Sequence, residues 1–163
     1  MNEPENRWRI YRATFDTNIF VRSLIHKDNL ANHLISLWLD GRFVLVLSQA
    51  IVDEIRDVLL RPTLMRKLQY TRTEAMRLID LLPQASVVEV PSSAELCRDP
   101  KDDKFVDCAI SGRVHFLVSY DKDLVDDAEL KRALFEFGVE VIEPPNFLEK
   151  IREVGIDVPD SGQ

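Results

Sequence analysis

The chain has 163 residues, of which 45% are hydrophobic and 30% are charged, and its formal net charge is −7. This length and composition are typical of one ordinary globular domain. No apolar run reaches the roughly 18 residues that cross a membrane, and the polar start "MNEPENRWR" lacks the apolar core of a secretion signal. We therefore expect a cytoplasmic protein with no membrane contact.

The hydrophobic pattern changes period repeatedly along the chain. A strand at 11–15 precedes two helices within 19–40 that break near "HKDN", and a second strand follows at 42–48. Ser48 has the position of an N-cap for a helix at 49–61. A helical turn at 63–69, a helix at 71–82 capped by Thr71 or Thr73, and a strand at 85–90 come next. The remaining elements are a helix at 102–112, a strand at 115–119, a helix at 127–138, a strand at 139–143 and a helix at 146–155.

Strands that are apolar nearly throughout and alternate with helices indicate an open parallel sheet covered on both faces. The sequence therefore predicts a three-layer α/β/α fold with a central sheet of about five strands. No linker rich in Pro, Gly or Ser divides the chain. We expect a single domain at 10–152, a flexible N-terminal tail at 1–9 and a C-terminal tail at 153–163.

Two of the predicted strands are followed closely by an aspartate. The strand in "RATFD" ends at Asp16, and the strand in "HFLVSYD" ends just before Asp121. The carboxyl ends of parallel strands lie at one edge of the sheet, where ligands bind and the following helices begin. Asp103, in the first turn of its helix, and Glu54, beside the buried stripe of another, belong to the same edge. Four carboxylates from four separate segments are thus expected to converge on one pocket.

Four carboxylates in one pocket would repel one another strongly unless a cation lies between them. Oxygen ligands without His or Cys indicate Mg²⁺ or Mn²⁺ rather than zinc. Hard cations held by carboxylates are a common means of hydrolysing phosphodiester bonds. The small polar residues Thr17, Asn18 and Ser119 lie beside the acids and could orient a carboxylate or a water molecule.

Each acid also has a purely structural explanation. Asp16 is a favourable helix N-cap, and Asp103 complements the dipole of its helix. Glu54 could be a surface residue and Asp121 a turn residue. The other acids near this edge are interpreted as structural or solvated: Asp99, Asp102, Asp107 and Asp123. Asp107 needs the most attention, because it lies four residues after Asp103 on the same helix face.

Three stretches occur in a characteristic order along the chain: "FDTNIFVRSL", "LSQAIVDEIRDVLLRP" and "DPKDDKFVDCAISGRVHFLVSYDKDL". Together they resemble the PIN-domain family of nucleases, over about residues 12 to 147. The first stretch resembles the opening strand and Asp-Thr-Asn motif of that family, and the second resembles its helix with the second acid, Glu54. In the third stretch the matching acids are Asp103 and Asp121. Asp107 stands where the family has a small apolar residue, which leaves Asp102 as the other candidate for the third acid.

The chain is most similar to the VapC-like branch of this family, the toxin components of bacterial and archaeal toxin–antitoxin pairs. The resemblance implies a sheet in the order 3-2-1-4-5 and cleavage of single-stranded RNA with Mg²⁺ or Mn²⁺. It also implies a homodimer and an antitoxin that covers the site. Apolar residues of the early helices could form either the core or a dimer face: Leu34, Leu37 and Trp38.

The net negative charge argues against a nucleic-acid partner, but the charge is unevenly distributed. Residues 61–77 contain five basic residues and one acid, Glu74. This segment is either a solvated helical face or a phosphate-binding surface. With RNA as the substrate, the candidates for contact with its backbone are Arg61, Arg66, Lys67 and Arg72.

The sequence thus supports a metal-dependent endoribonuclease as the main hypothesis. The alternative is a catalytically silent module with the same fold that acts through protein or RNA binding. A receiver-type phosphoryl-transfer domain has a similar sheet but requires a lysine placed after a late strand. Lys122 is badly placed for that role, because it directly follows Asp121.

Overall fold

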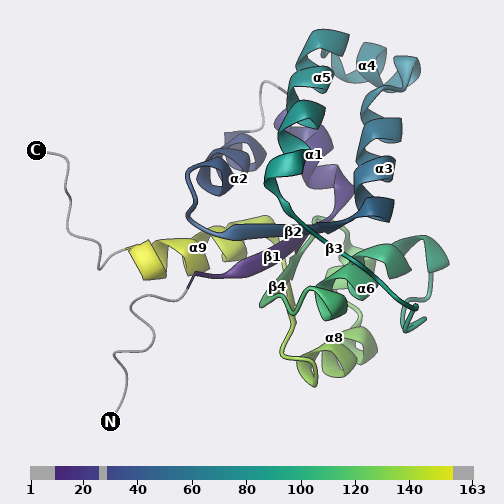
Figure 1. Cartoon of the computed structure of the whole chain (residues 1–163), viewed down its shortest axis with the longest axis vertical. Helices are drawn as coiled ribbons and strands as arrows, with labels where there is room; N and C mark the ends of the chain where they lie inside the picture. The colour runs from purple at the N-terminus through teal and green to yellow at the C-terminus, as the bar shows by residue number, and fades with distance from the viewer. Residues whose placement is uncertain (1–9, 26–28, 156–163) are drawn as a thin grey trace, which may run out of the picture.

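Five parallel strands form one sheet in the order β3-β2-β1-β4-β5 in this computed structural model, which describes residues 10–25 and 29–155 (Figure 1). The strands are β1 (Arg12–Phe15), β2 (Val44–Ser48), β3 (Ser86–Val88), β4 (Phe116–Val118) and β5 (Glu140–Ile142). Each lies within a predicted strand. The parallel sheet and its order are therefore confirmed.

Helices follow every strand and cover the sheet on both sides. The helices after β1 and β2 are α1 (Thr17–Ser23), α2 (Asn29–Leu39), α3 (Gln49–Leu59), α4 (Pro62–Leu68) and α5 (Arg72–Leu81). The helices after β3, β4 and β5 are α6 (Asp103–Ser111), α7 (Lys122–Val125), α8 (Ala128–Phe135) and α9 (Pro144–Gly155). The sequence pattern did not predict α7 or two 3₁₀ turns, Leu82–Gln84 and Pro100–Asp102. Elements of three or four residues are too short to show a hydrophobic period.

The helices form two layers around the sheet, which confirms the three-layer α/β/α fold. In Figure 1, α1, α3, α4 and α5 lie above the sheet, and α6 and α8 lie below it. Helix α1 packs against α2 and α3, whereas α6 packs against β1, β2 and β4. The chain runs outward from β1 to β2 and β3 and then returns past β1 to β4 and β5, with all five strands parallel. All the loops that follow the strands consequently lie at one edge of the sheet.

Capping residues determine where several helices begin and end. The Ser48 hydroxyl accepts a hydrogen bond from the Ile51 N–H at 3.4 Å, which confirms it as the N-cap of α3. Of the two candidate threonines, Thr71 caps α5, and it forms a capping box with Glu74 through bonds of 3.1 and 3.0 Å. After α8 the chain turns at Gly138, whose φ of +77° suits glycine.

Four phenylalanine rings form the centre of the core between the sheet and α9. Phe147 is 0% exposed, and its ring lies 5.0 to 5.7 Å from the rings of Phe15, Phe43 and Phe116. The pairs are edge-to-face, the arrangement that aromatic rings prefer. Because Phe15 precedes Asp16 directly, this packing also fixes the end of β1.

Two of the three apolar residues considered for a dimer face belong to the core. Leu34 and Trp38 of α2 are buried within one chain, and Leu37 packs against the core while partly exposed. The apolar stripe of α2 is thus used inside the domain, against α1 and α9.

The predicted N-terminal tail at 1–9 lies outside the described residues, and so does most of the predicted C-terminal tail. Helix α9 continues through residues 153–155, and residues 156–163 are not described. Over the part of the chain that the structure covers, no helix has the length and apolar character needed to cross a membrane.

Candidate active site

Asp16 and Asp121 meet at the carboxyl edge of the sheet through a shared hydroxyl. Phe15 at the end of β1 pairs with Val118 at the end of β4, so Asp16 and Ser119 leave the sheet side by side. The Ser119 hydroxyl donates a hydrogen bond to Asp16 Oδ2 at 2.6 Å, and its oxygen accepts one from the Asp121 N–H at 2.9 Å. A hydroxyl can do both at once. One serine therefore positions the Asp16 carboxylate against the backbone of Asp121.

The negative charge of Asp16 is only partly compensated. Asp16 is 6% exposed, and as the N-cap of α1 it accepts a hydrogen bond from the Asn18 N–H at 3.3 Å. Burial raises the pKa of the Asp16 carboxyl. The bonds from Ser119 and Asn18 lower this pKa, whereas the charges of Asp121 and Glu54 raise it, and the net result is a raised pKa. A cation at this position would favour the ionised form.

Glu54 reaches the same site from the second turn of α3. The hydroxyl of Thr17, the residue after Asp16, donates a hydrogen bond to Glu54 Oε2. The other oxygen, Oε1, lies 2.7 Å from the Lys104 ammonium of α6. Glu54 is thus held between α1 and α6, and its charge has a partner.

The two consecutive aspartates at the start of α6 have different surroundings. Asp103 accepts a hydrogen bond from the Cys97 N–H at 3.0 Å and so holds the preceding loop. For Asp102, burial above all raises the pKa to about 6. Neighbouring negative charges add to this shift, in the order Asp121, Asp99, Asp16 and Asp123. The charge of Asp102 therefore interacts with those of both Asp16 and Asp121.

Two further acids near this edge make structural contacts. Asp107 is buried and accepts a hydrogen bond from the Ala94 N–H at 2.9 Å. Together with Asp103 it ties α6 to the loop at 89–99. Asp123 is exposed, and its N–H donates to Asp121 Oδ1 at 2.9 Å, so Asp121 is also the N-cap of α7.

Most of the chain matches a known family model. The model described as the PIN domain matches residues 12–123, a range that contains all the acids discussed above. The chain belongs to the PIN-domain family. PIN domains are generally nucleases that use divalent metal ions. A comparison with curated proteins gives no significant match.

The acids of this PIN domain have the donor chemistry of a site for a hard divalent cation. Among residues 10–25 and 29–155, no three His, Cys, Asp or Glu side chains are grouped so that they could hold a metal ion as they stand. The acids nevertheless offer only carboxylate oxygens, and a cation would offset the burial and the neighbouring negative charges that raise the pKa values of Asp16 and Asp102. By this donor chemistry the site fits Mg²⁺ or Mn²⁺.

The basic residues predicted to contact a nucleic acid all have exposed side chains: Arg61, Arg66, Lys67 and Arg72. Arg61 and Lys67 line a hollow of about 270 Å³ together with Asn18. Asn18 lies two residues after Asp16, so this hollow borders the acids of the PIN domain. Arg61 also pairs with Asp57 at 2.7 Å, an exposed ion pair of small energy.

Two contacts beside the acids involve residues that were not among the candidates from the sequence. Lys104 pairs with Glu54, and the Arg22 guanidinium lies 3.9 Å from the centre of the Tyr120 ring, next to Asp121. The sequence contains a signal for Lys104, because a lysine in the first turn of a helix opposes the helix dipole unless a carboxylate pairs with it. The Arg22–Tyr120 contact has no such signal, since it joins two distant segments.

Proposed function

We propose that this PIN domain is a metal-dependent endoribonuclease that hydrolyses phosphodiester bonds of single-stranded RNA. The observation that carries the proposal is the surroundings of Asp16. Ser119 links this carboxylate to Asp121, and burial together with neighbouring acids raises its pKa. The proposed cofactor is Mg²⁺ or Mn²⁺. The acids proposed to hold it are Asp16, Glu54, Asp121 and one of the consecutive pair Asp103 and Asp102, of which the raised pKa favours Asp102.

The residues around the acids have distinct roles in this proposal. A bound Mg²⁺ or Mn²⁺ would supply Lewis-acid assistance and an activated water. The Ser119 hydroxyl keeps the Asp16 carboxylate in one orientation, and the Thr17 hydroxyl does the same for Glu54. Lys104 neutralises Glu54, which reduces the repulsion that an incoming phosphate would meet.

The basic segment supports RNA binding in this proposal. A chain with a net charge of −7 must bind phosphates through a local positive surface. Arg61 and Lys67 provide one beside Asn18, and the exposed Arg66 and Arg72 extend the basic segment. Single-stranded RNA would then pass from this surface to the acids.

The test is the cleavage of a fluorogenic single-stranded RNA by purified protein with Mg²⁺ or Mn²⁺. Asp16→Asn should lower the rate by about 100-fold or more while the fold is retained, since it removes a proposed metal ligand. The matched control is Asp80→Asn, an exposed acid of α5, which should keep the wild-type rate. Chelation of the metal should stop cleavage by the wild type.

Equal rates for Asp16→Asn and the wild type would contradict the proposal and would point to a contaminating nuclease. Calorimetric titration with Mn²⁺ separates an enzyme from a silent binding module. The enzyme should give a heat of binding that Asp16→Asn loses, whereas a silent module should give none.

We further propose that the enzyme is cytoplasmic, forms a homodimer and is the toxin of a toxin–antitoxin pair. The support is the resemblance of its three motifs to VapC-like toxins. Because Leu34 and Trp38 are buried within one chain, these two residues are not available for a dimer contact. Expression of the wild type, but not of Asp16→Asn, should arrest growth, and a protein encoded next to the gene should relieve the arrest. Growth without arrest would contradict the toxin role.

A further inference from the structure

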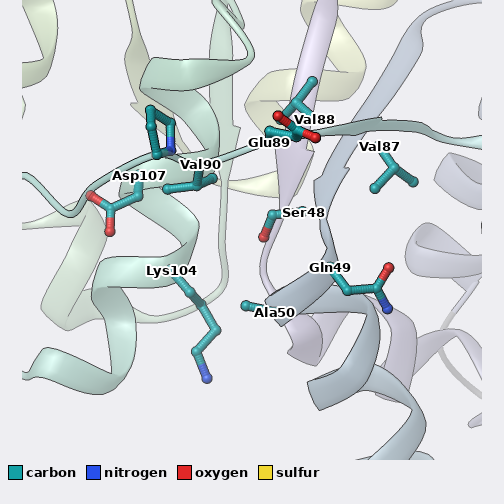
Figure 2. A pocket seen from close by; sticks show the side chains of 10 residues that line it. Ser48, Gln49, Ala50, Val87, Val88, Glu89, Val90, Lys104 and Asp107 are labelled. Carbon is teal, nitrogen blue, oxygen red and sulfur yellow. The ribbon is translucent and has the colours of Figure 1, made fainter.

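A hollow of about 770 Å³ lies beside the acids at the same edge of the sheet (Figure 2). Its lining comes from the end of β3 with the following loop, from the first turn of α3, and from α6. Figure 2 shows Val87 to Val90 along one side, Gln49 and Ala50 on α3, and Lys104 and Asp107 on α6. The volume is within the range of ligand pockets, roughly 300–1,000 Å³.

The walls of this pocket combine apolar surface with five polar or charged residues: Ser48, Gln49, Glu89, Lys104 and Asp107. Val87 is 49% exposed although it is a large hydrophobic residue, and Val90 and Ala50 add to the apolar lining. The Gln49 amide donates to Asp53 at 2.9 Å, which leaves its carbonyl oxygen as an acceptor for a ligand. Apolar walls together with hydrogen-bonding and charged groups suit a planar heterocycle such as a nucleobase, which has apolar faces and a polar edge.

Lys104 connects this pocket with the acids. It lines the pocket, and its ammonium lies 2.7 Å from Glu54 Oε1. Helix α6 begins beside Asp102 and reaches the pocket at Asp107, over about 7.5 Å at a rise of 1.5 Å per residue. One nucleotide can bridge this separation. The lysine has three N–H donors, so it can bind Glu54 and a phosphate oxygen together.

We propose that this pocket binds the base of the unpaired nucleotide next to the scissile phosphate, and that Lys104 contacts the phosphate between them. The inference rests on the proposed function, because it takes RNA as the substrate. The base lies against the valines of the β3 side, with its edge toward Gln49. The pocket then determines which base the enzyme prefers at that position.

The experiment is an NMR titration of the ¹⁵N-labelled full-length chain with each of the four nucleoside 5′-monophosphates, without metal. Amide shifts should concentrate at Gln49, at residues 87–90 and near Lys104. Ala50→Leu fills part of the pocket from an exposed position. It should weaken the binding of the preferred monophosphate by about tenfold, the order expected when stacking of one base is lost. Ala128→Leu is the control, because Ala128 is also an exposed alanine in the first turn of a helix.

Cleavage kinetics provide a second readout. With single-stranded RNA, Ala50→Leu should raise KM about tenfold with little change in kcat, and it should weaken the base preference at the cut site. Amide shifts outside the pocket, or equal effects of Ala128→Leu on KM, would overturn the proposed base site. They would not contradict the proposed ribonuclease function.

Failure of the proposed function has a different signature. If the wild type cuts no RNA but the monophosphates still shift the pocket amides, the pocket binds nucleotides and the proposed ribonuclease function is wrong. If the monophosphates cause no shifts and a protein partner protects residues 87–90 instead, the pocket is a protein-binding surface and the proposal is overturned.

Discussion

Replacement of Asp102 with asparagine should stabilise the metal-free protein at neutral pH. The pKa of Asp102 is raised from 3.8 to about 6. Burial is the largest cause, and the charges of Asp121 and other aspartates add to it. For a fully buried group this rise of about two units would correspond to ~3 kcal/mol. Asp102 is partly exposed, so solvent screens the interaction, and we expect a gain of about 1–2 kcal/mol.

The gain in stability from Asp102→Asn should depend on pH. Between about pH 4 and 6, the folded protein keeps a proton on Asp102 that the unfolded chain has released. Wild-type stability from this group therefore falls as the pH rises through that range. Above it, Asp102 is ionised in both states and the full penalty applies, whereas below it the penalty is absent. The advantage of Asp102→Asn should be complete at about pH 7.5 and lost near pH 4.

The assay is urea unfolding with a chelator at these two pH values, and Asp103→Asn is the matched control. Asp103 accepts a hydrogen bond from the Cys97 N–H, and asparagine keeps only a neutral acceptor there. Asp103→Asn should therefore lose about 0.5–1 kcal/mol instead of gaining stability.

The same two variants separate the proposed metal ligand from its neighbour. Mn²⁺ at about 100 times its dissociation constant should stabilise the wild type and Asp103→Asn by ~2.7 kcal/mol. Asp102→Asn should respond much less. The reasoning would be refuted if Asp102→Asn were destabilised at neutral pH and only Asp103→Asn lost the response to Mn²⁺, because Asp103 would then be the ligand.

Three further substitutions test the scaffold that holds the acids. Phe147→Ala should lower the free energy of unfolding by about 3–5 kcal/mol, because it empties the centre of the aromatic core; chemical denaturation measures this. Gly112→Ala would place a Cβ 2.5 Å from Val46 Cγ1 and should cost about 1–3 kcal/mol in the same assay, and unchanged stability would show that the Val46 side chain can move aside. Asp107→Ala should speed hydrogen exchange at the Ala94 amide and cost about 1–3 kcal/mol, whereas unchanged exchange would show that this bond does not hold the loop.

The fold could be predicted from local patterns because each strand and long helix has its own hydrophobic period. The three residues before Asp16, Ala13, Thr14 and Phe15, are all 0% exposed, as expected of a strand buried on both faces. The strand order 3-2-1-4-5 came from the resemblance of the motifs, since periodicity does not specify which strands pair. The short helix α7 escaped prediction because four residues make only one turn.

The candidate site was predictable to the level of segments but not of individual atoms. Strand ends placed Asp16 and Asp121 at one edge, and they do lie on either side of Ser119. The choice between Asp102 and Asp103 could not be made, because consecutive residues at a helix start point in directions that depend on the preceding loop. That loop is held by the Cys97 N–H bond to Asp103, a contact visible only in three dimensions.

The sequence by itself determined the alternation of strands and helices, the acids at the strand ends and the position of the main helix caps. These features depend on neighbouring residues, so they can be read locally. The tertiary structure alone decided that Lys104 pairs with Glu54 across fifty positions and that Asp107 holds a loop. It also decided that the negative charges of Asp102 and Asp16 interact. Such contacts join separate segments, and their energies depend on distance and burial that only the packed chain defines.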